Sequence, residues 1–388
     1  MGTDGDSVIS EVGRKYLQLQ LTDSVGPIRL RNLTAHFGSL DAVLGVSVSE
    51  LCRVEGIGEH TARSIFRSRS DDAVNREVER SAACGLRIVC AEDADYPKSL
   101  YHIPDSPICL YVRGHLEPTD SVAIAIVGSR RCSHYGREQA VRFGELLGGA
   151  GFTVVSGLAR GIDGHAHRGA LRGGGRTIAV LGNGLASVYP PEHKSLATDI
   201  ADTGALLSEF PVDSPPEGKN FPRRNRIIIG LALGVIVVEA SKRSGALISA
   251  RLASEYNREV FAIPGRVDQP EYSAGANYLI RDGQAKLITC LEDVLDELGQ
   301  VGEIIGQDLS PFTLGDDGAA ALVSQPIPRL TGDEQKVLSA IAKGSEDADA
   351  ICASTKLETS RIASTLTSLQ LKGAIKRLPG DHFVKRGS

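Results

Sequence analysis

The sequence VAIAIVGSR, residues 122–130, is a short apolar run that ends in a glycine, a serine and an arginine. Similar runs follow it, each separated from the next by a glycine-containing loop and a helical stretch. Short buried strands that alternate with helices are typical of a parallel sheet. The pattern therefore predicts an α/β fold with a mostly parallel sheet. The predicted strands are Val122–Val127, Thr153–Val155, Thr177–Leu181, Ala205–Leu207, Val235–Val238 and Val260–Ala262.

The composition of the 388-residue chain excludes several classes of protein. No apolar run approaches the roughly 20 residues of a membrane-spanning helix, and the polar, acidic residues 1–10 do not resemble a signal peptide. The seven cysteines include no C-x-x-C pair, which argues against a disulfide framework or a zinc site. We therefore expect a cytoplasmic protein without metal or membrane contact. The net charge is −5, so any nucleic-acid binding must come from local basic patches.

The chain divides into four regions. Residues 1–80 are helical in pattern, and residues 85–298 contain the predicted sheet. Residues 301–325 contain four acidic and no basic side chains, together with glycine, serine and proline, as in a flexible linker. Residues 328–388 form a small C-terminal unit.

The two flanking regions have patterns of their own. Residues 51–62, LCRVEGIGEHTA, resemble a helix-hairpin-helix motif, and a degenerate earlier copy at residues 24–33 would complete a paired, SAM-like domain. Such a hairpin either presents backbone amides to a DNA phosphate or serves only protein contacts and structure. Three helical patterns and a short hairpin in residues 328–388 resemble a winged helix, with ten basic and seven acidic side chains. Binding of duplex DNA and binding of a protein both remain open for this unit.

Glycine-containing loops follow four of the predicted strands. In a parallel sheet these loops lie at one edge, where ligands bind, and helix N-termini there direct free N–H groups at anions. The loops therefore predict a phosphate-binding rim, with tight turns alone as the alternative reading. The rim residues predicted to bind are Gly128, Ser129, Arg130, Gly157, Arg160, Gly161, Ser244 and Gly245.

The anion is not predicted to be a dinucleotide or a nucleoside triphosphate. After the first strand the sequence is GSRRCS, which lacks the G-x-G-x-x-G pattern, and the chain contains no G-x-x-x-x-G-K-[ST] loop. We therefore expect no nucleotide cofactor.

The segment KNFPRRNR, residues 219–226, packs four cations and one aromatic side chain into eight residues. Cations neutralise phosphates, and an aromatic face stacks an unpaired base. Positive charge at a helix N-terminus opposes the helix dipole, which favours a ligand as the reason for these arginines. The alternative is a solvated helix start with the phenylalanine as a core plug. The residues predicted to bind DNA here are Lys219, Phe221, Arg223, Arg224, Asn225 and Arg226.

No catalytic constellation is evident. His165 and His167 are two positions apart and point to different sides of a helix, so they do not form a metal-binding pair. Capping by Asp163 and packing by His167 are the better interpretations. Glu209 and Glu239 each follow a strand, where loop hydrogen bonding explains an acid more often than chemistry does. We therefore assign no catalytic residue.

Taken together, these segments resemble the DNA-processing protein A family, also called DprA or Smf. The matching motifs, in chain order, are Tyr96-Pro97, Leu100, Ile103-Pro104-Asp105, GSR (128–130), SGLARGID (156–163) with Ala166-His167, TIAVLGNG (177–184) with Tyr189-Pro190, Ser208-Glu209-Phe210-Pro211, FPRRNRII (221–228), VVEA (237–240) with Ser244-Gly245, and FAIPG (261–265).

The resemblance implies an extended Rossmann-like core that binds single-stranded DNA and has no established enzymatic activity. It also implies a homodimer formed through that core and the loading of RecA onto incoming strands during natural transformation. The family's charged pocket residues correspond to Arg130, Lys194 and Lys219, and Phe221 matches the base-stacking position. The rival hypothesis is an enzyme that uses the same rim to process a nucleotide or nucleotide sugar. That enzyme would need a placed acid–base pair, which the sequence does not offer.

Overall fold

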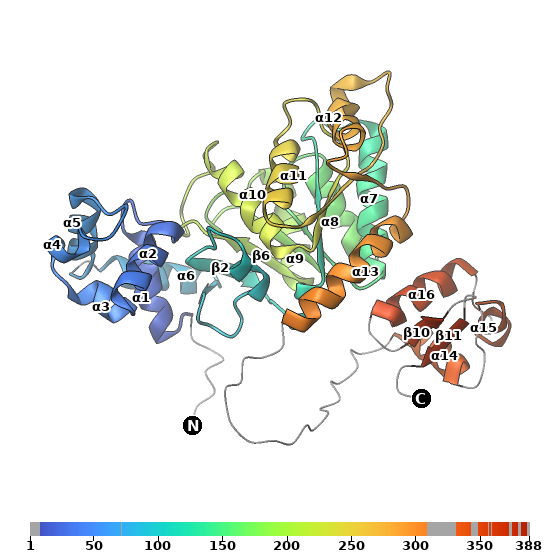
Figure 1. The fold of residues 1–388 in the computed structure, drawn as a ribbon, viewed down its shortest axis with the longest axis horizontal. Coiled ribbons are helices and arrows are strands. Elements are labelled where there is room, and N and C mark those ends of the chain that lie inside the picture. The colour runs from blue at the N-terminus through green and yellow to red at the C-terminus, as the bar shows by residue number, and fades with distance from the viewer. Residues whose placement is uncertain are drawn as a thin grey trace.

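The structure is a computed structural model that describes residues 8–70, 72–308, 331–342, 348–355, 357, 359–371, 375–378 and 382–385. Within these residues the chain forms a helical N-terminal domain, a core around a nine-stranded sheet, and a C-terminal unit with a two-stranded sheet (Figure 1). None of the described helices is both long enough and apolar enough to cross a membrane.

The nine-stranded sheet has the order β1-β2-β6-β5-β4-β3-β7-β8-β9. The strands from β3 to β9 pair in parallel, while β1 and β2 are antiparallel to their neighbours. All six predicted strands are confirmed, and β1, β2 and β9 were not predicted. The bounds are β1 Arg87–Cys90, β2 Cys109–Gly114, β3 Ala123–Val127, β4 Thr153–Ser156, β5 Thr177–Val180, β6 Ala205–Ser208, β7 Gly234–Val237, β8 Glu259–Ala262 and β9 Lys286–Leu287.

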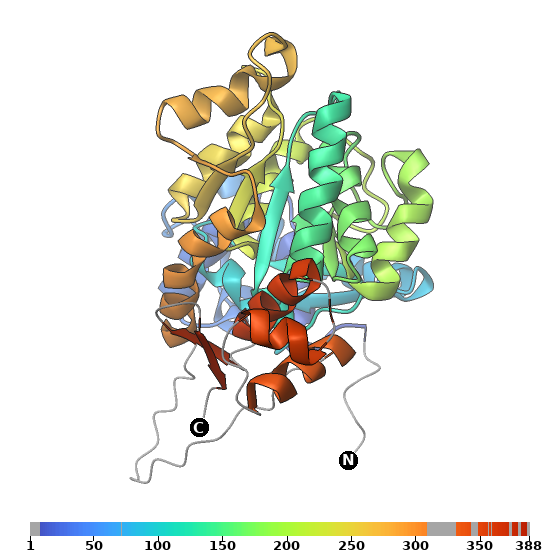
Figure 2. The same cartoon turned by 90° about the vertical axis from the view of Figure 1, so that its right-hand side faces the viewer.

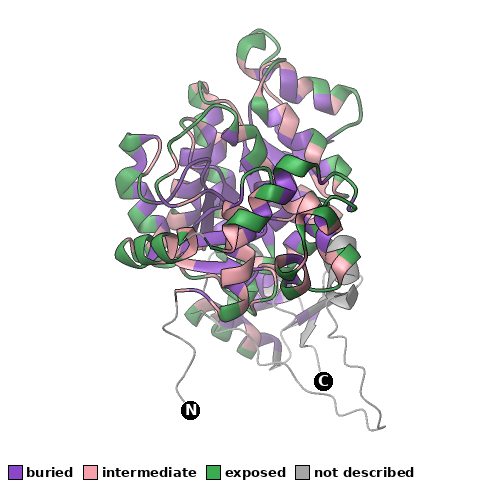
Figure 3. Ribbon diagram, turned by 90° about the vertical axis from the view of Figure 1, so that its left-hand side faces the viewer, coloured by how far each residue is buried: buried purple, intermediate pink, exposed green. Residues whose placement is uncertain are grey.

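Helices cover both faces of the sheet, as the alternation within β3 shows. Ala123, Ala125 and Val127 belong to a core cluster with α10, α11 and α12, whereas Ile124 and Ile126 belong to one with α7, α8 and α13. Figure 3 shows this buried centre in purple beneath exposed outer turns. The bounds are α7 His134–Gly149, α8 Ile162–Arg172, α9 Lys194–Thr203, α10 Asn220–Leu231, α11 Gly245–Glu255, α12 Pro270–Arg281 and α13 Leu291–Asp308.

Helices α7 and α8 approach each other closely through glycines (Figure 2). A Cβ atom at Gly169 of α8 would lie only 2.2 Å from the carbonyl oxygen of Val141 on α7. This contact sets the distance between the two helices. It thereby fixes the loops that precede them at the carboxyl edge of the sheet.

The N-terminal helices pack against the antiparallel end of the sheet. The Gln20 side chain donates to the carbonyl of Glu209 (2.9 Å) and accepts from the Cys109 N–H (2.7 Å). Arg80 pairs with Asp213 at 2.7 Å. These contacts join the domain to the core, and the predicted boundary at residue 80 falls inside the last of its helices. The bounds are α1 Glu11–Leu21, α2 Pro27–Phe37, α3 Leu40–Gly45, α4 Val48–Leu51, α5 Glu59–Ser68 and α6 Ala73–Ala83.

The predicted linker begins too early. Helix α13 continues through Asp308. The acidic composition suggested a linker from residue 301, but apolar residues at helical spacing continue beyond that position. Residues 309–330 lie outside the described part of the chain. In the C-terminal unit, three helices and a hairpin follow, as predicted for a winged helix. The bounds are α14 Gly332–Ala342, α15 Ala348–Thr355, α16 Thr359–Leu371, β10 Ile375–Leu378 and β11 His382–Lys385.

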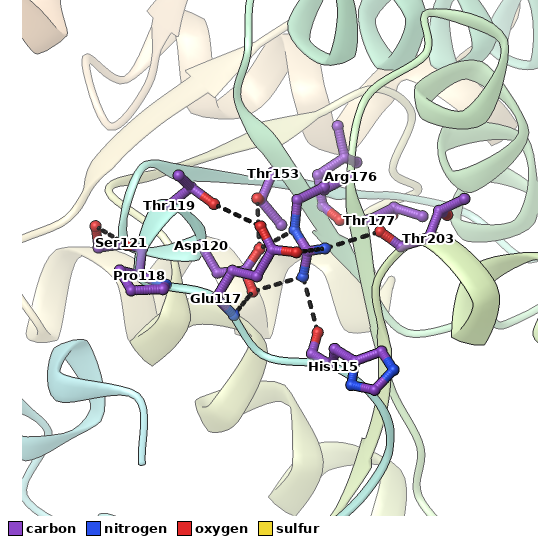
Figure 4. A network of polar contacts seen from close by, with 11 residues as sticks. His115, Glu117, Pro118, Thr119, Asp120, Ser121, Thr153, Arg176, Thr177 and Thr203 are labelled. Atoms are coloured by element: carbon purple, nitrogen blue, oxygen red, sulfur yellow. Dashed lines mark hydrogen bonds and ion pairs between the residues drawn. The ribbon is translucent and has the colours of Figure 1, made fainter. Parts of the chain in front are cut away.

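Internal contacts close the amino edge of the parallel strands. Arg176, just before β5, forms hydrogen bonds of 2.9 Å to each carboxylate oxygen of Asp120 and one of 2.8 Å to Glu117 (Figure 4). It also donates to the carbonyls of His115 and Thr203. These bonds hold the segment between β2 and β3 against the amino end of β5. The opposite, carboxyl edge carries the glycine-containing loops.

Candidate nucleic-acid interface

A shallow hollow lies at the carboxyl edge of the sheet, where the loops after β3, β4 and β5 meet the start of α10. Its volume is about 20 Å³, so a ligand would rest on it rather than be enclosed. The hollow joins residues that are up to 91 positions apart in the chain, from Arg130 to Phe221. The lining residues are Arg130, Gly157, Ala159, Arg160, Gly182, Tyr189, Pro190 and Phe221.

The Phe221 ring is the centre of this hollow. Its side chain is only partly buried, and it lies outside the buried core clusters of the described chain. The ring sits above Gly182, where a Cβ atom would come within 2.9 Å of it, and its centroid is 5.8 Å from that of Tyr189. The guanidinium of Arg130 lies 4.8 Å from the Phe221 centroid. The partial exposure of the ring disagrees with the core-plug alternative, and the Arg130 guanidinium lies over the face of the ring.

Two arginines give the hollow its positive charge. Arg160 pairs with Glu192, which raises the pKa of the arginine and lowers that of the glutamate, so part of this charge is already neutralised. Arg130 is exposed and has no ion pair with a carboxylate among the described residues. Arg130 is therefore the cation of the hollow best placed to receive a phosphate.

Three backbone amides of the loops are not available to an anion, because other groups of the protein accept their hydrogen bonds. The N–H groups of Gly157 and Ala159 donate to the buried carboxylate of Asp163, at 3.2 and 3.4 Å. The N–H of Ser129 donates to the carbonyl of Glu239 at 2.8 Å. Asp163 thus caps this loop, and Gly161 takes the N-cap position of α8 instead. These three amides therefore donate within the protein and not to a ligand.

Two predicted glycines serve packing within the protein. Gly161 has a φ of +75°, and a Cβ atom there would lie 2.3 Å from the carbonyl oxygen of Ser129. A Cβ atom at Gly128 would lie 2.5 Å from the side chain of Ile162. The tight-turn interpretation of these glycines therefore holds, because their missing side chains let the loops after β3 and β4 pack together.

A buried glutamate fills the place where a dinucleotide would bind. The strand order reverses between β3 and β7, and in such sheets a pyrophosphate lies there against a helix N-terminus. Here Ser133, at the N-cap of α7, donates from its backbone N–H (2.9 Å) and its hydroxyl (2.5 Å) to the Glu239 carboxylate. Glu239 is 3% exposed. The predicted loop hydrogen bonding by this acid is confirmed, and the arrangement argues against a dinucleotide ligand.

Two of the predicted DNA-binding arginines lie inside the protein, because the segment 219–226 forms the first turns of α10 and part of that helix is buried. Arg224 is 3% exposed and donates to the carbonyls of Gly157 and Val180. Burial lowers its pKa to about 10, and the charge of Asp163 opposes that shift. Arg224 therefore supports the hollow from below and does not reach a phosphate.

Arg226 is the second correction. It is 6% exposed and pairs with Glu209 and, at 3.2 Å, with Asp105. Burial raises the pKa of the Glu209 carboxyl, and the Arg226 charge opposes that shift. Arg224 and Arg226 are two positions apart and point to different sides of α10. Both sides are covered by other parts of the protein, whereas Arg223 is exposed.

The other predicted residues do not line the hollow. Lys194 is exposed at the start of α9, and Lys219, at the N-cap of α10, pairs with Glu217 at 2.8 Å. Arg223 is exposed, and Asn225 is partly buried. Ser244 caps α11, and Gly245 opens it. The residues that the prediction missed are Ala159, Gly182, Tyr189 and Pro190. Each lies within a motif of the family resemblance, but none was selected as a binding residue.

The histidines of α8 show no catalytic arrangement. His167 is fully buried, and its Nδ1 lies 2.7 Å from the hydroxyl of Thr177, which itself donates to the carbonyl of Val154. Burial lowers the pKa of His167 to about 3, which keeps the ring neutral. Its predicted packing role is confirmed. No group of three or more metal-ligating side chains occurs among the described residues.

Comparisons with known proteins agree with this architecture. Residues 87–299 match the family described as DNA recombination-mediator protein A, residues 322–381 a DprA winged helix domain, and residues 23–78 a helix-hairpin-helix motif. Protein Smf of Synechocystis is 35% identical over 96% of this chain and 98% of its own length. Protein Smf of Escherichia coli is 36% identical over 92% of this chain and 95% of its own.

Two solved structures share the fold. DNA processing protein A from Streptococcus pneumoniae has a TM-score of 0.65 and 34% identity, over 74% of this chain and 97% of that one. DNA processing protein A from Helicobacter pylori, solved to describe its single-stranded DNA binding mode, has a TM-score of 0.50 and 31% identity, over 56% of this chain and 98% of that one. The chain is a member of the DNA recombination-mediator protein A family, with a helix-hairpin-helix domain before the Rossmann-like core and a winged-helix domain after it.

Proposed function

We propose that this chain is a single-stranded-DNA-binding recombination mediator, and that the hollow around Phe221 holds one nucleotide of the strand. The observation that carries the proposal is the partly exposed Phe221 ring between Tyr189 and Arg130, an arginine without an ion pair in the described part of the chain. A base stacks on such a ring, and an adjacent guanidinium neutralises its phosphate. The Helicobacter pylori relative, which binds single-stranded DNA, supports the same ligand class.

The finer parts of the proposal follow the family resemblance. We infer that the protein acts in the cytoplasm during natural transformation, where it protects incoming strands and passes them to RecA. We also infer that it works as a homodimer through the Rossmann-like core and catalyses no reaction. The contacts of Glu239 and Asp163 support the inference that the protein catalyses no reaction. Both carboxylates accept hydrogen bonds from the backbone of loops and of a helix start, and neither faces the hollow.

The proposal predicts a preference for single strands. Mixed-sequence oligonucleotides should bind the purified protein comparably, and single strands should bind more tightly than duplex of the same length, because stacking needs an unpaired base. Fluorescence anisotropy of both forms at moderate salt measures this. A strong preference for blunt duplex of one sequence would contradict the proposal and transfer DNA binding to the winged-helix domain.

A further inference from the structure

A second concavity lies between the N-terminal domain and the core. It is a cleft of about 360 Å³, within the range of small-molecule sites. The start of helix α2, from its N-cap Gly26, forms one wall. Helices α10 and α11 and the loop before β2 form the other. The charged and large apolar side chains that line the cleft are Ile28, Arg29, Asp105, Arg223, Arg226 and Leu252. Neither the core family match nor the helix-hairpin-helix match alone spans this cleft, since it is built from both segments.

The charged groups of the cleft favour an anion. Arg29 donates to the carbonyls of Gly56 and Ser24, which leaves its charge unneutralised, and Arg223 is exposed with no ion pair among the described residues. Arg226 pairs with the cleft carboxylate, Asp105. Arg226 also pairs with the buried Glu209, so three guanidinium groups meet two carboxylates, and the charges of Arg29 and Arg223 remain without an ion pair among the described residues.

The floor of the cleft contains an unsatisfied donor. Arg226 is only 6% exposed, and its Nη1 has no hydrogen-bond partner among the described residues. A buried guanidinium N–H without an acceptor costs free energy, so such a group favours a ligand oxygen. Helix α2 adds to this, since it begins at Pro27 with no side-chain cap and directs its N-terminal dipole at the cleft.

The walls of the cleft are apolar. Ile28 is 51% exposed, and Pro27, Pro222 and Leu252 line the same cleft. An apolar wall facing guanidinium groups matches a nucleotide, which has a flat base and a charged phosphate. A purely ionic ligand would leave the apolar wall unused.

The cleft is next to the hollow around Phe221. Phe221 lines the hollow, while Pro222 and Arg223, the next two residues of α10, line the cleft. The first turn of α10 thus contributes to both concavities. The two concavities are therefore separated by the width of one helix, roughly 10–12 Å, which a strand of a few nucleotides can span.

We propose that the cleft between the helix-hairpin-helix domain and the core is a second nucleotide subsite, which takes a neighbouring nucleotide of the same single strand. This proposal rests on the proposed function of the hollow. It assigns the N-terminal domain a direct part in DNA binding through the start of α2, with Arg223 and Arg226 on the opposite wall. A free mononucleotide has the same base and phosphate groups. The experiment must therefore distinguish a nucleotide of a bound strand from a free mononucleotide.

The test compares strands of two lengths. Ile28→Glu places a carboxylate in the cleft at a solvent-exposed position in the first turn of a helix, where an acid is compatible with folding. Phe66→Glu is the matched control, because Phe66 is 49% exposed, lies in the same domain and does not line the cleft. Each protein is titrated with oligothymidylates of about four and about 20 nucleotides, and with thymidine monophosphate. Melting temperatures check the fold.

Ile28→Glu is expected to bind the longer strand about tenfold more weakly than wild type, while the shorter strand, held by the hollow, binds unchanged. Phe66→Glu should match wild type on both. Arg223→Ala, a second variant, should weaken the longer strand alone and reduce its salt slope by about one. Wild-type binding of the longer strand by both cleft variants would overturn the proposal. Tight monophosphate binding that Ile28→Glu abolishes, with strand binding intact, would also overturn it. Failure of the wild-type protein to bind any single strand would instead refute the function of the hollow.

Discussion

Phe221→Ala is expected to weaken single-strand binding by about 1–3 kcal/mol, or roughly 5- to 150-fold, because one stacked base is lost. The ring is partly exposed above Gly182, so its removal should change the melting temperature little. Stacking is not ionic, and the dependence of affinity on salt should therefore stay nearly constant. Anisotropy titrations at several salt concentrations, together with a melting curve of the same sample, measure both quantities.

Phe221→Trp provides the control for this prediction. An indole offers a larger stacking face in the same position and should retain most of the affinity. The opposite pattern, in which Phe221→Ala melts early but binds DNA as the wild type does, would assign the ring to the core. The single-strand site would then lose its base-stacking residue.

Arg224→Ala is expected to cost about 1.5–3 kcal/mol of folding free energy, because it leaves two buried carbonyl groups without their charged donor. Arg224 binds the carbonyls of Gly157 and Val180, and its charge opposes the burial of Asp163. Its loss frees the loop after β4 that carries Arg160. Chemical denaturation of the variant and the wild type measures the difference.

Arg223→Ala is the matched control for stability, since Arg223 is the adjacent arginine and is exposed. It should unfold at nearly the wild-type denaturant concentration. If Arg224→Ala folds too poorly to purify, Arg224→Lys keeps the charge and should be intermediate. A variant Arg224→Ala with wild-type stability and a flatter salt slope would show that this arginine contacts phosphate after all.

Much of the fold could be predicted because short apolar runs determine buried parallel strands. The runs ending at Val127 and Val237 are apolar throughout and are buried on both faces. Strand β9 could not be predicted, since it has two exposed residues and exists only through pairing with β8. The start of the linker was misplaced because composition does not show where helix α13 ends.

The position of the site was predicted, but the sequence did not show which of its residues face a ligand and which support the structure. Arg130 and Arg160 were predicted from their place in the loops after strands, and Phe221 from the basic segment around it; the structure brings the three together. The sequence could not separate Arg223 from Arg224, because that distinction depends on which side of α10 faces the sheet. Nor could it show that Asp163 and Glu239 satisfy the loop amides and the start of α7. Those partners are 6 and 106 positions away from the groups they bind.

The proposed single-strand site depends most directly on Arg130 as the phosphate-binding cation beside Phe221. Arg131 is the natural control, since it is the next residue, is also exposed and does not line the hollow. Single-strand affinity is measured for Arg130→Ala and Arg131→Ala over a range of salt concentrations. Arg130→Ala should bind at least about tenfold more weakly than wild type, with a salt slope reduced by about one, whereas Arg131→Ala should bind nearly as the wild type does. Wild-type affinity and salt slope in Arg130→Ala would contradict the assignment of the hollow as the single-strand site.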